Sequence, residues 1–270
     1  SILKPLCHGR CHPWLDGYTL AKLIEYEFHN RSYKLVICDT IQQKNRERDY
    51  MNMLLRNKVD GIIVGSTQQT LEEYTRMQLP IVTLDIDLGE NIPCVRANHE
   101  QGGRLAARKL IDNGCRHVFQ LTTEANTNTL ALIRNDTFRR EVEANGLLCS
   151  TANLKRDEFY IEDYQQSTER VYDEFTQEAD GIFVTDIEAA IAIHWAQKRG
   201  RHIPEDLKIV GYDGTYFSRL THPELTTIKQ PLEKVAHSAV DNLIHLIEHE
   251  PIESTHIIYN VSILEGDTTI

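Results

Sequence analysis

The stretch Val59-Asp60-Gly61-Ile62-Ile63-Val64 recurs in the second half of the chain as Ala179-Asp180-Gly181-Ile182-Phe183-Val184. In both copies an Asp-Gly pair leads from a stretch of helical period into a short apolar run rich in β-branched residues. A run of this kind, bounded by turn residues, is typical of a buried strand. The repeat therefore predicts two similar α/β halves.

The same alternation of apolar runs and helical stretches continues along the chain and predicts βαβ units. We expect strands at 35–38, 61–64, 81–84, 117–121, 181–184 and 208–211, and helices at 15–30, 44–56, 71–77, 100–112, 130–143, 164–176, 187–198 and 232–249. The expected fold class is α/β, with two similar open, Rossmann-like sheets of parallel strands. Such sheets bind ligands at the carboxyl ends of their strands, so a ligand cleft is expected between the two halves.

Composition narrows the possible functions. The 270 residues are enough for two domains with a core that needs no disulfide or metal. A formal net charge of −11 argues against a chain that grips a phosphate backbone unaided. No apolar run is long enough to span a membrane, and the first residues lack a secretory pattern. Together with six scattered cysteines, expected to be reduced thiols, these features predict a cytoplasmic protein.

Several stretches, read in order, resemble the effector-binding region of the LacI/GalR family of bacterial transcription regulators, which shares the type I fold of periplasmic sugar-binding proteins. The stretch Leu225-Thr226-Thr227-Ile228-Lys229-Gln230-Pro231 is the most specific. The others lie at 33–40, 59–63, 79–85, 102–106 and 203–213, the last containing Val210-Gly211-Tyr212-Asp213. Their order and spacing carry the resemblance over nearly the whole chain.

The resemblance implies two subdomains and a chain that crosses between them three times, near Asn98, Gln230 and Ile258. The expected boundaries are 1–97 plus 231–258 for the N-terminal subdomain and 98–230 plus 259–270 for the C-terminal one. Family members also carry a DNA-binding helix-turn-helix of about 60 residues, which is absent from this chain. The expected function is therefore the effector-binding and dimerisation domain of a LacI-type repressor.

A sugar effector requires paired hydrogen-bond donors and acceptors together with an aromatic surface. The resemblance assigns the acceptor role to Asp213 and the role of a ligand-binding arginine to Arg134, whose fork of donors suits neighbouring hydroxyls. The remaining expected ligand-binding residues are Trp14, Asp85, Phe159, Thr185 and Gln230. A turn aspartate, a surface arginine and a buried tryptophan are the structural alternatives for Asp213, Arg134 and Trp14.

Two groups of residues imitate metal sites. Cys7, His8, Cys11 and His12 offer four ligands within six residues, too close together to complete a tetrahedron easily. His245-Leu246-Ile247-Glu248-His249 matches an inverted zincin motif, but it lies at the end of the amphipathic 232–249 stretch, where a solvated helix face is the simpler interpretation. We therefore expect no metal and no other cofactor.

No nucleophile elbow, P-loop or dinucleotide-binding fingerprint is present, so the chain is not expected to be an enzyme. The expected partners are a small sugar, a mono- or disaccharide with or without phosphate, and operator DNA reached through an upstream domain. A homodimer is also expected, with no membrane contact. The alternative within the same fold is a periplasmic or extracellular sugar-binding protein of a transport system. The sequence leaves open which sugar is bound and whether it induces or co-represses.

Overall fold

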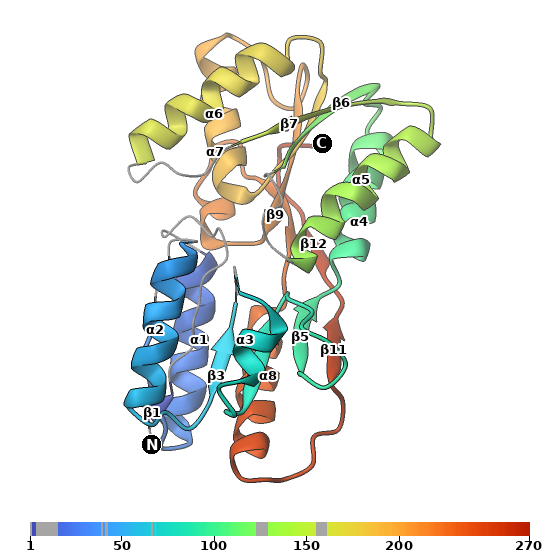
Figure 1. The fold of residues 1–270 in the computed structure, drawn as a ribbon. Helices are drawn as coiled ribbons and strands as arrows, with labels where there is room; N and C mark the ends of the chain where they lie inside the picture. Colours follow the sequence, from blue (N-terminus) through green and yellow to red (C-terminus); the bar gives the residue numbers. More distant parts are fainter. Residues whose placement is uncertain are drawn as a thin grey trace. The chain divides into compact units, whose positions relative to one another are not determined.

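The computed structural model describes residues 2–3, 16–38, 40, 43–65, 67, 69–122, 129–154 and 161–270 (Figure 1). The described residues fall into two compact units. Unit 1 is drawn from Ser1–Ala97, Ala125–Leu130 and Pro231–Tyr259, and unit 2 from Asn98–Glu124, Ala131–Gln230 and Asn260–Ile270. The expected α/β class with parallel sheets is confirmed in both units.

Unit 1 is built on a parallel sheet of four strands. Their order is β11 (His256–Tyr259), β5 (Cys94–Ala97), β4 (Ile81–Leu84) and β3 (Ile62–Val64). A separate parallel pair joins β1 (Ile2–Leu3) to β2 (Lys34–Leu35). The strands β3 and β4 are buried at every position, as expected of a sheet covered on both faces.

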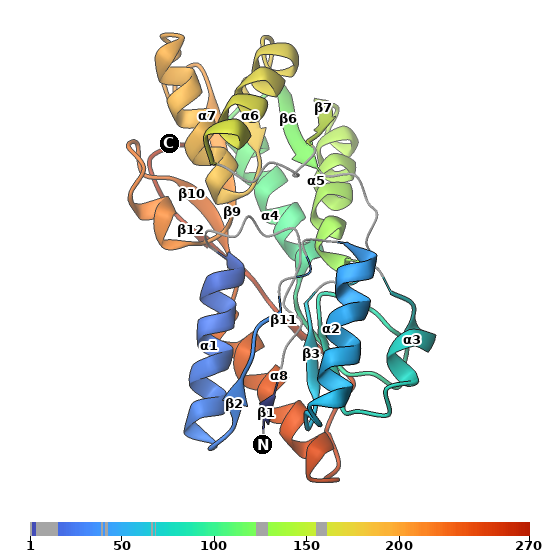
Figure 2. The same cartoon turned by 60° about the vertical axis from the view of Figure 1, so that its left-hand side comes forward.

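Helices cover the two faces of this sheet, as Figure 2 shows. On one face, α1 (Asp16–Asn30) and α8 (Leu232–Ile247) pack their apolar residues against β3, β4 and β5. On the other, α2 (Lys44–Arg56) and α3 (Leu71–Thr75) enclose a second apolar cluster. The apolar stripe expected along α8, including Val235, Val240 and Leu243, is part of the first core.

Unit 2 contains a sheet of six strands. Their order is β12 (Ser262–Leu264), β10 (Thr226–Lys229), β9 (Lys208–Asp213), β8 (Gly181–Phe183), β6 (His117–Thr122) and β7 (Leu148–Asn153). All neighbours are parallel except β10 and β12. Parallel strands bring their carboxyl ends to one edge, which is where β8, β9 and β10 end.

Two pairs of helices cover the faces of this second sheet (Figure 1). The helices α6 (Ile161–Phe175) and α7 (Asp186–Lys198) pack on one face around Tyr164, Tyr172 and Trp195. The helices α4 (His99–Asp112) and α5 (Ile133–Ala144) lie together on the other, where Phe138 stacks on Phe183. Two short 3₁₀ turns complete the described elements: η1 (Leu130–Leu132), which begins in unit 1 and ends in unit 2, and η2 (Tyr216–Arg219) in unit 2.

Several strands of the structure were not expected from periodicity. The missed strands are β1, β5, β7, β10, β11 and β12. The edge strand β11 alternates exposed and half-buried residues, and β7 is half exposed along most of its length. β7 also lacks a continuous apolar run, since its sequence is Leu-Cys-Ser-Thr-Ala-Asn. The two copies of the repeat correspond to β3, at an edge of the unit 1 sheet, and to β8, in the interior of the unit 2 sheet.

The division into units differs from the expected boundaries at two described places. Tyr259, expected in the C-terminal subdomain, groups with unit 1, where it pairs with Ala97. Thr129 and Leu130, expected in the C-terminal subdomain, group with unit 1. Thr129 forms an antiparallel bridge with Ile86, and the Leu130 amide donates to the Asp85 carbonyl at 2.7 Å. These backbone bonds after β4 account for the different grouping.

The chain leaves unit 1 at the ends of β5 and β11. These two strands are paired, with Cys94 opposite His256 and Ala97 opposite Tyr259. Just beyond them, in unit 2, the Asn98 side-chain amide donates to the Asn260 side-chain oxygen at 3.0 Å. The Val261 amide donates to the Gln101 side chain at 2.9 Å. The two crossing segments are therefore joined by hydrogen bonds as they enter unit 2.

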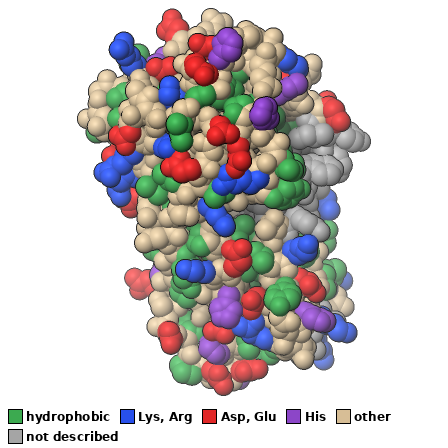
Figure 3. All heavy atoms as spheres, turned by 180° about the vertical axis from the view of Figure 1, so that it is seen from behind, with side chains coloured by type: hydrophobic (Ala, Val, Ile, Leu, Met, Phe, Trp, Pro, Cys, Tyr) green, Lys and Arg blue, Asp and Glu red, His purple; other side chains and the backbone are tan. Residues whose placement is uncertain are grey.

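Charged side chains are mixed over the molecular face shown in Figure 3, where Lys and Arg are scattered among acidic residues. Basic side chains do not gather into a stripe on this face. This distribution agrees with the excess of acidic residues in the sequence.

The core between α8 and the unit 1 sheet provides a stability test. Leu243 is fully buried there, and its removal would leave a cavity among packed side chains. We expect Leu243→Ala to lower the free energy of unfolding by about 2 to 5 kcal/mol, measured by urea denaturation. The control Leu220→Ala removes a side chain that is 70% exposed and should change stability by less than about 0.5 kcal/mol. Equal effects of the two changes would contradict the assigned core.

Candidate functional site

Asp213 ends β9 at the carboxyl edge of the unit 2 sheet and is buried, with 6% of its surface exposed. The Gln230 side-chain amide donates to its Oδ1 at 2.7 Å, and the Gln230 backbone amide donates to its carbonyl at 3.1 Å. Its φ of 110° is unusual for a residue with a side chain. Defined partners therefore hold Asp213 in an unfavourable backbone conformation. A solvated turn aspartate would not need such partners.

The next residue explains how this turn fits. Gly214 has a φ of 70°, and a Cβ there would lie 2.5 Å from Cα of Lys229 on β10. Only glycine permits both the left-handed conformation and this close approach. The Asp213–Gly214 turn thus packs directly against the end of the neighbouring strand.

Arg134 is the second residue of α5 and lies over Tyr212, with its Cζ 4.5 Å from the ring centroid. The approach of α5 to α4 depends on Gly103, since a Cβ there would overlap the Arg134 carbonyl oxygen. Gly102 similarly leaves room for the Tyr212 ring, whose Cε2 would lie 2.7 Å from an added Cβ. Gly103 therefore determines where the Arg134 backbone can lie, and Gly102 determines where the Tyr212 ring lies beneath the Arg134 guanidinium.

Asp186, at the start of α7, is 2% exposed and lies on the side of β9 opposite to the ring of Tyr212. It accepts hydrogen bonds from the Thr215 amide at 2.6 Å, from the Thr215 hydroxyl at 2.8 Å, and from the Thr227 hydroxyl. Gly211 leaves space for its carboxylate on β9. Burial, followed by the nearby charge of Asp213, raises the pKa of Asp186 to about 7.

Thr185 caps the N-terminus of α7 and is half-buried. Its amide and hydroxyl both donate to Oε2 of Glu188, at 3.0 and 2.8 Å. Glu188 also accepts from the Tyr164 hydroxyl at 2.6 Å. The Thr185 hydroxyl proton is therefore used within the protein, in the capping box that Thr185 forms with Glu188.

The other expected residues lie elsewhere. Asp85 follows β4 in unit 1, with a φ of 55° and its backbone bonded to Val95 and Leu130. Trp14 and Phe159 lie outside the described residues. The structure thus brings Arg134, Asp213, Gln230 and Thr185 to one edge of the unit 2 sheet. We call Arg134, Thr185, Asp186, Asp213 and Gln230 the carboxyl-edge group.

Some residues that build this group were not recognised in the sequence. His99 and Tyr212 are fully buried, and the Tyr212 hydroxyl is hydrogen-bonded to His99 Nδ1 at 2.8 Å. Thr215 and Thr227 hold Asp186. The pair Gly102-Gly103 inside a helix was the available signal, because two adjacent helical glycines indicate that other groups approach closely.

The metal-like motifs do not form a site in the described part of the chain. There, no group of three or more His, Cys, Asp or Glu residues could hold a metal ion. The helix expected over 232–249 ends earlier, at Ile247, and His249 has a φ of 58°, so His245 and His249 do not share a helix face. Cys7, His8, Cys11 and His12 lie outside the described residues.

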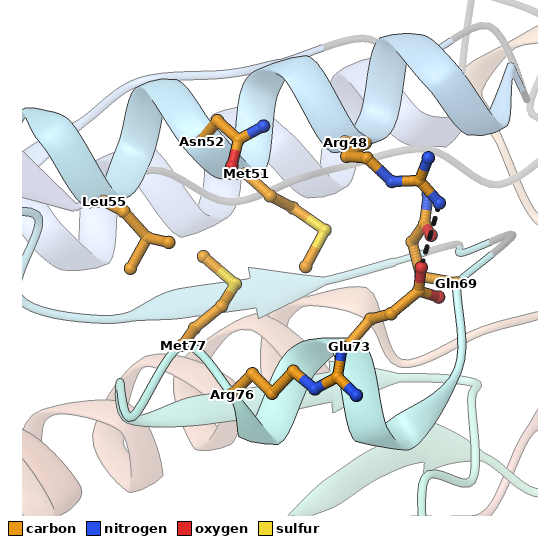
Figure 4. A pocket seen from close by; sticks show the side chains of 8 residues that line it. All are labelled: Arg48, Met51, Asn52, Leu55, Gln69, Glu73, Arg76 and Met77. Atoms are coloured by element: carbon orange, nitrogen blue, oxygen red, sulfur yellow. Dashed lines mark hydrogen bonds and ion pairs between the residues drawn. The ribbon is translucent and has the colours of Figure 1, made fainter.

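A separate pocket of about 220 Å³ lies in unit 1 between α2 and α3 (Figure 4). Met51, Leu55 and Met77 form its apolar part, and Arg48 is paired with Glu73 at 3.1 Å. None of the expected ligand-binding residues lines it. Met51 and Leu54 belong to the core of unit 1, whereas Leu55 is 42% exposed.

None of the helices formed by the described residues has the length and apolar character needed to cross a membrane.

Two parallel-sheet units, with polar side chains at a carboxyl edge, define the class of periplasmic-binding-protein-like ligand-binding proteins. The family model described as a periplasmic binding protein-like domain matches residues 107–269. The solved structure of a periplasmic binding protein/LacI transcriptional regulator from Alkaliphilus metalliredigens, complexed with D-xylulofuranose, has a TM-score of 0.86 and 27% identity. The match covers 100% of this chain and 99% of that one.

Curated relatives identify the regulator branch of this class. The chain is 33% identical over 266 residues to the sucrose operon repressor of Streptococcus mutans, covering 96% of this chain and 80% of the relative. It is 31% identical over 252 residues to the ribose operon repressor of Halalkalibacterium halodurans, covering 93% and 74%. The chain belongs to the LacI family of transcriptional regulators and forms their effector-binding domain. These relatives are repressors and not enzymes.

The raised pKa of Asp186 predicts a pH-dependent stability. Between its ordinary pKa of 3.8 and about 7, the folded protein retains a proton that the unfolded chain releases. The free energy of unfolding should therefore fall as pH rises through this window, by at most about 1.4 kcal/mol per pH unit. We expect Asp186→Asn, measured by urea unfolding, to lack this component.

Relative to Asp186→Asn, the unfolding free energy of wild type should fall from pH 4 to 7 and stay constant above pH 7. The control Asp267→Asn changes an exposed aspartate of the same unit and should follow the wild-type pH profile. Parallel profiles for wild type and Asp186→Asn would show that Asp186 is not protonated in this range.

Proposed function

We propose that this domain binds a small sugar at the carboxyl-edge group of unit 2 and thereby controls DNA binding by its regulator. The observation that carries the proposal is the hydrogen-bonded pair of buried Asp213 and half-buried Gln230 at the end of β9, together with the guanidinium of Arg134 over the ring of the preceding residue, Tyr212. A carboxylate and an amide oxygen accept from ligand hydroxyls, while Arg134 donates to ligand oxygens. Together they match the alternating donors and acceptors of a polyol.

The comparisons support the ligand class. Two relatives are named as repressors of sucrose and ribose operons, and the Alkaliphilus structure contains a furanose sugar. We therefore propose a mono- or disaccharide as effector. Because the relatives are repressors, we propose a regulator acting in the cytoplasm in preference to a transport component. The contributions expected of Asp85, Trp14 and Phe159 remain predictions from the sequence.

Calorimetric titration tests this proposal directly. Sucrose, D-ribose and D-xylulose are titrated into the wild-type domain and into Asp213→Ala. Loss of charge-assisted hydrogen bonds worth about 1.5 to 3 kcal/mol each predicts at least about a 10-fold weaker affinity. The control Asp267→Ala, exposed and distant in sequence, should bind as the wild type does. An Asp213→Ala protein with unchanged affinity would reject the proposed site.

Asp85→Asn in the same titration tests the expected contribution of unit 1. If Asp85 accepts a hydrogen bond from the sugar, its conversion to the neutral amide should weaken binding several-fold. Unchanged affinity would remove Asp85 from the ligand-binding residues, while the assignment of Asp213 would stand.

We further propose that the domain is a homodimer. Sedimentation equilibrium should then give twice the chain mass of 31.1 kDa. Such a dimer would hold two DNA-reading domains together, as expected for palindromic operators. A single species of 31.1 kDa at micromolar concentration would contradict it.

A further inference from the structure

Arg134 is connected to the beginning of α4 through two successive contacts. Its guanidinium lies over the Tyr212 ring at 4.5 Å, and the Tyr212 hydroxyl is hydrogen-bonded to His99 at 2.8 Å. We propose that Tyr212 and His99 are positioning residues, which hold the Arg134 guanidinium ready for ligand oxygens without touching the ligand themselves. This proposal rests on the proposed role of Arg134 in sugar binding.

The ring of Tyr212 has little freedom to move. It is fully buried, and Gly102 of α4 lies so close that an added Cβ would be 2.7 Å from Cε2 and 2.8 Å from the hydroxyl. The Phe183 ring packs edge-on against it, with centroids 6.0 Å apart. A ring enclosed in this way is a fixed surface on which a cation can rest.

Arg134 needs such a surface because arginine is long and flexible. An arginine that is free in the unbound protein loses rotamer entropy when it grips a ligand, and this loss weakens binding. A cation within about 6 Å of an aromatic centroid is attracted to the ring face, which restricts the guanidinium beforehand. Stacking on Tyr212 therefore reduces the cost of ordering Arg134 during binding.

His99 fixes the far end of this arrangement. It is the first residue of α4 and is fully buried, and the preceding Asn98 accepts a hydrogen bond from the Gln101 amide at 3.0 Å. Asn98 is also the first residue of unit 2 after the chain leaves β5. The Arg134 guanidinium is thus connected through Tyr212 and His99 to the point where the chain enters unit 2.

The first experiment needs no ligand. NMR relaxation of the Arg Nε–Hε groups measures how rigidly each guanidinium is held. We expect a rigid Arg134 in wild type, an intermediate one in Tyr212→Phe, which retains the ring but not the hydroxyl, and a mobile one in Tyr212→Leu. Arg199, which lies over Trp195 and pairs with Asp173, is the internal control and should not change. Equal Arg134 mobility in all three proteins would overturn the proposal.

The second experiment is a double-mutant cycle on the affinity for the sugar that binds tightest among sucrose, D-ribose and D-xylulose. Tyr212→Leu alone should weaken binding about 10-fold, which corresponds to the loss of one oriented contact. If Tyr212 acts through Arg134, adding Tyr212→Leu to Arg134→Met should weaken binding no further. Fully additive losses would overturn the proposal, since Tyr212 would then act independently of Arg134.

The outcomes separate this inference from the proposed function. Unchanged affinity in Arg134→Met would remove Arg134 from the ligand-binding residues and overturn both. A weakened Arg134→Met beside an unaffected Tyr212→Leu would overturn the inference alone. His99→Gln, which retains hydrogen-bonding groups at this position, should bind more tightly than His99→Leu. Equal affinities of the two His99 variants would show that His99 takes no part in positioning Arg134.

Discussion

Close packing at Gly102 and Gly103 of α4 is the constraint on which the carboxyl-edge group depends. Gly103 lets the start of α5 approach until the Arg134 carbonyl lies where a Cβ would be, and Gly102 admits the ring of Tyr212. A methyl group at either position would force α4 away from its neighbours, because protein interiors have few voids into which atoms can shift. The position of Arg134 over Tyr212 therefore follows from the absence of two side chains.

The last residues of β9 make the remaining contacts of this region from alternating faces of the strand. Gly211 leaves space for Asp186 of α7, and Tyr212 faces α4 and α5. Asp213 then ends the strand with Gln230 as partner. Successive residues of a strand point to opposite faces, so three consecutive positions serve three different neighbours. The motif Gly211-Tyr212-Asp213 thus joins both helical layers of unit 2 to the proposed ligand contact.

The buried carboxylates of this region also have a structural role. Asp186 orders the turn after Asp213 through Thr215, and it reaches β10 through Thr227. Glu188 connects the first turn of α7 to Tyr164 of α6. Each carboxylate is satisfied by several donors, as buried charge requires. Some of the polar side chains at the carboxyl ends of the strands therefore stabilise the site itself.

Periodicity and motif order were sufficient for the α/β class, the strands β3, β4, β6, β8 and β9, and the placement of Asp213 after a strand. These features depend on neighbours along the chain, whose spacing is visible in the sequence. The remaining strands, the grouping of Thr129 and Leu130 with unit 1, and the contacts of Tyr212 with Arg134 and His99 required the folded chain. They depend on residues that are distant in sequence and meet only through packing, so no local pattern of residues records them.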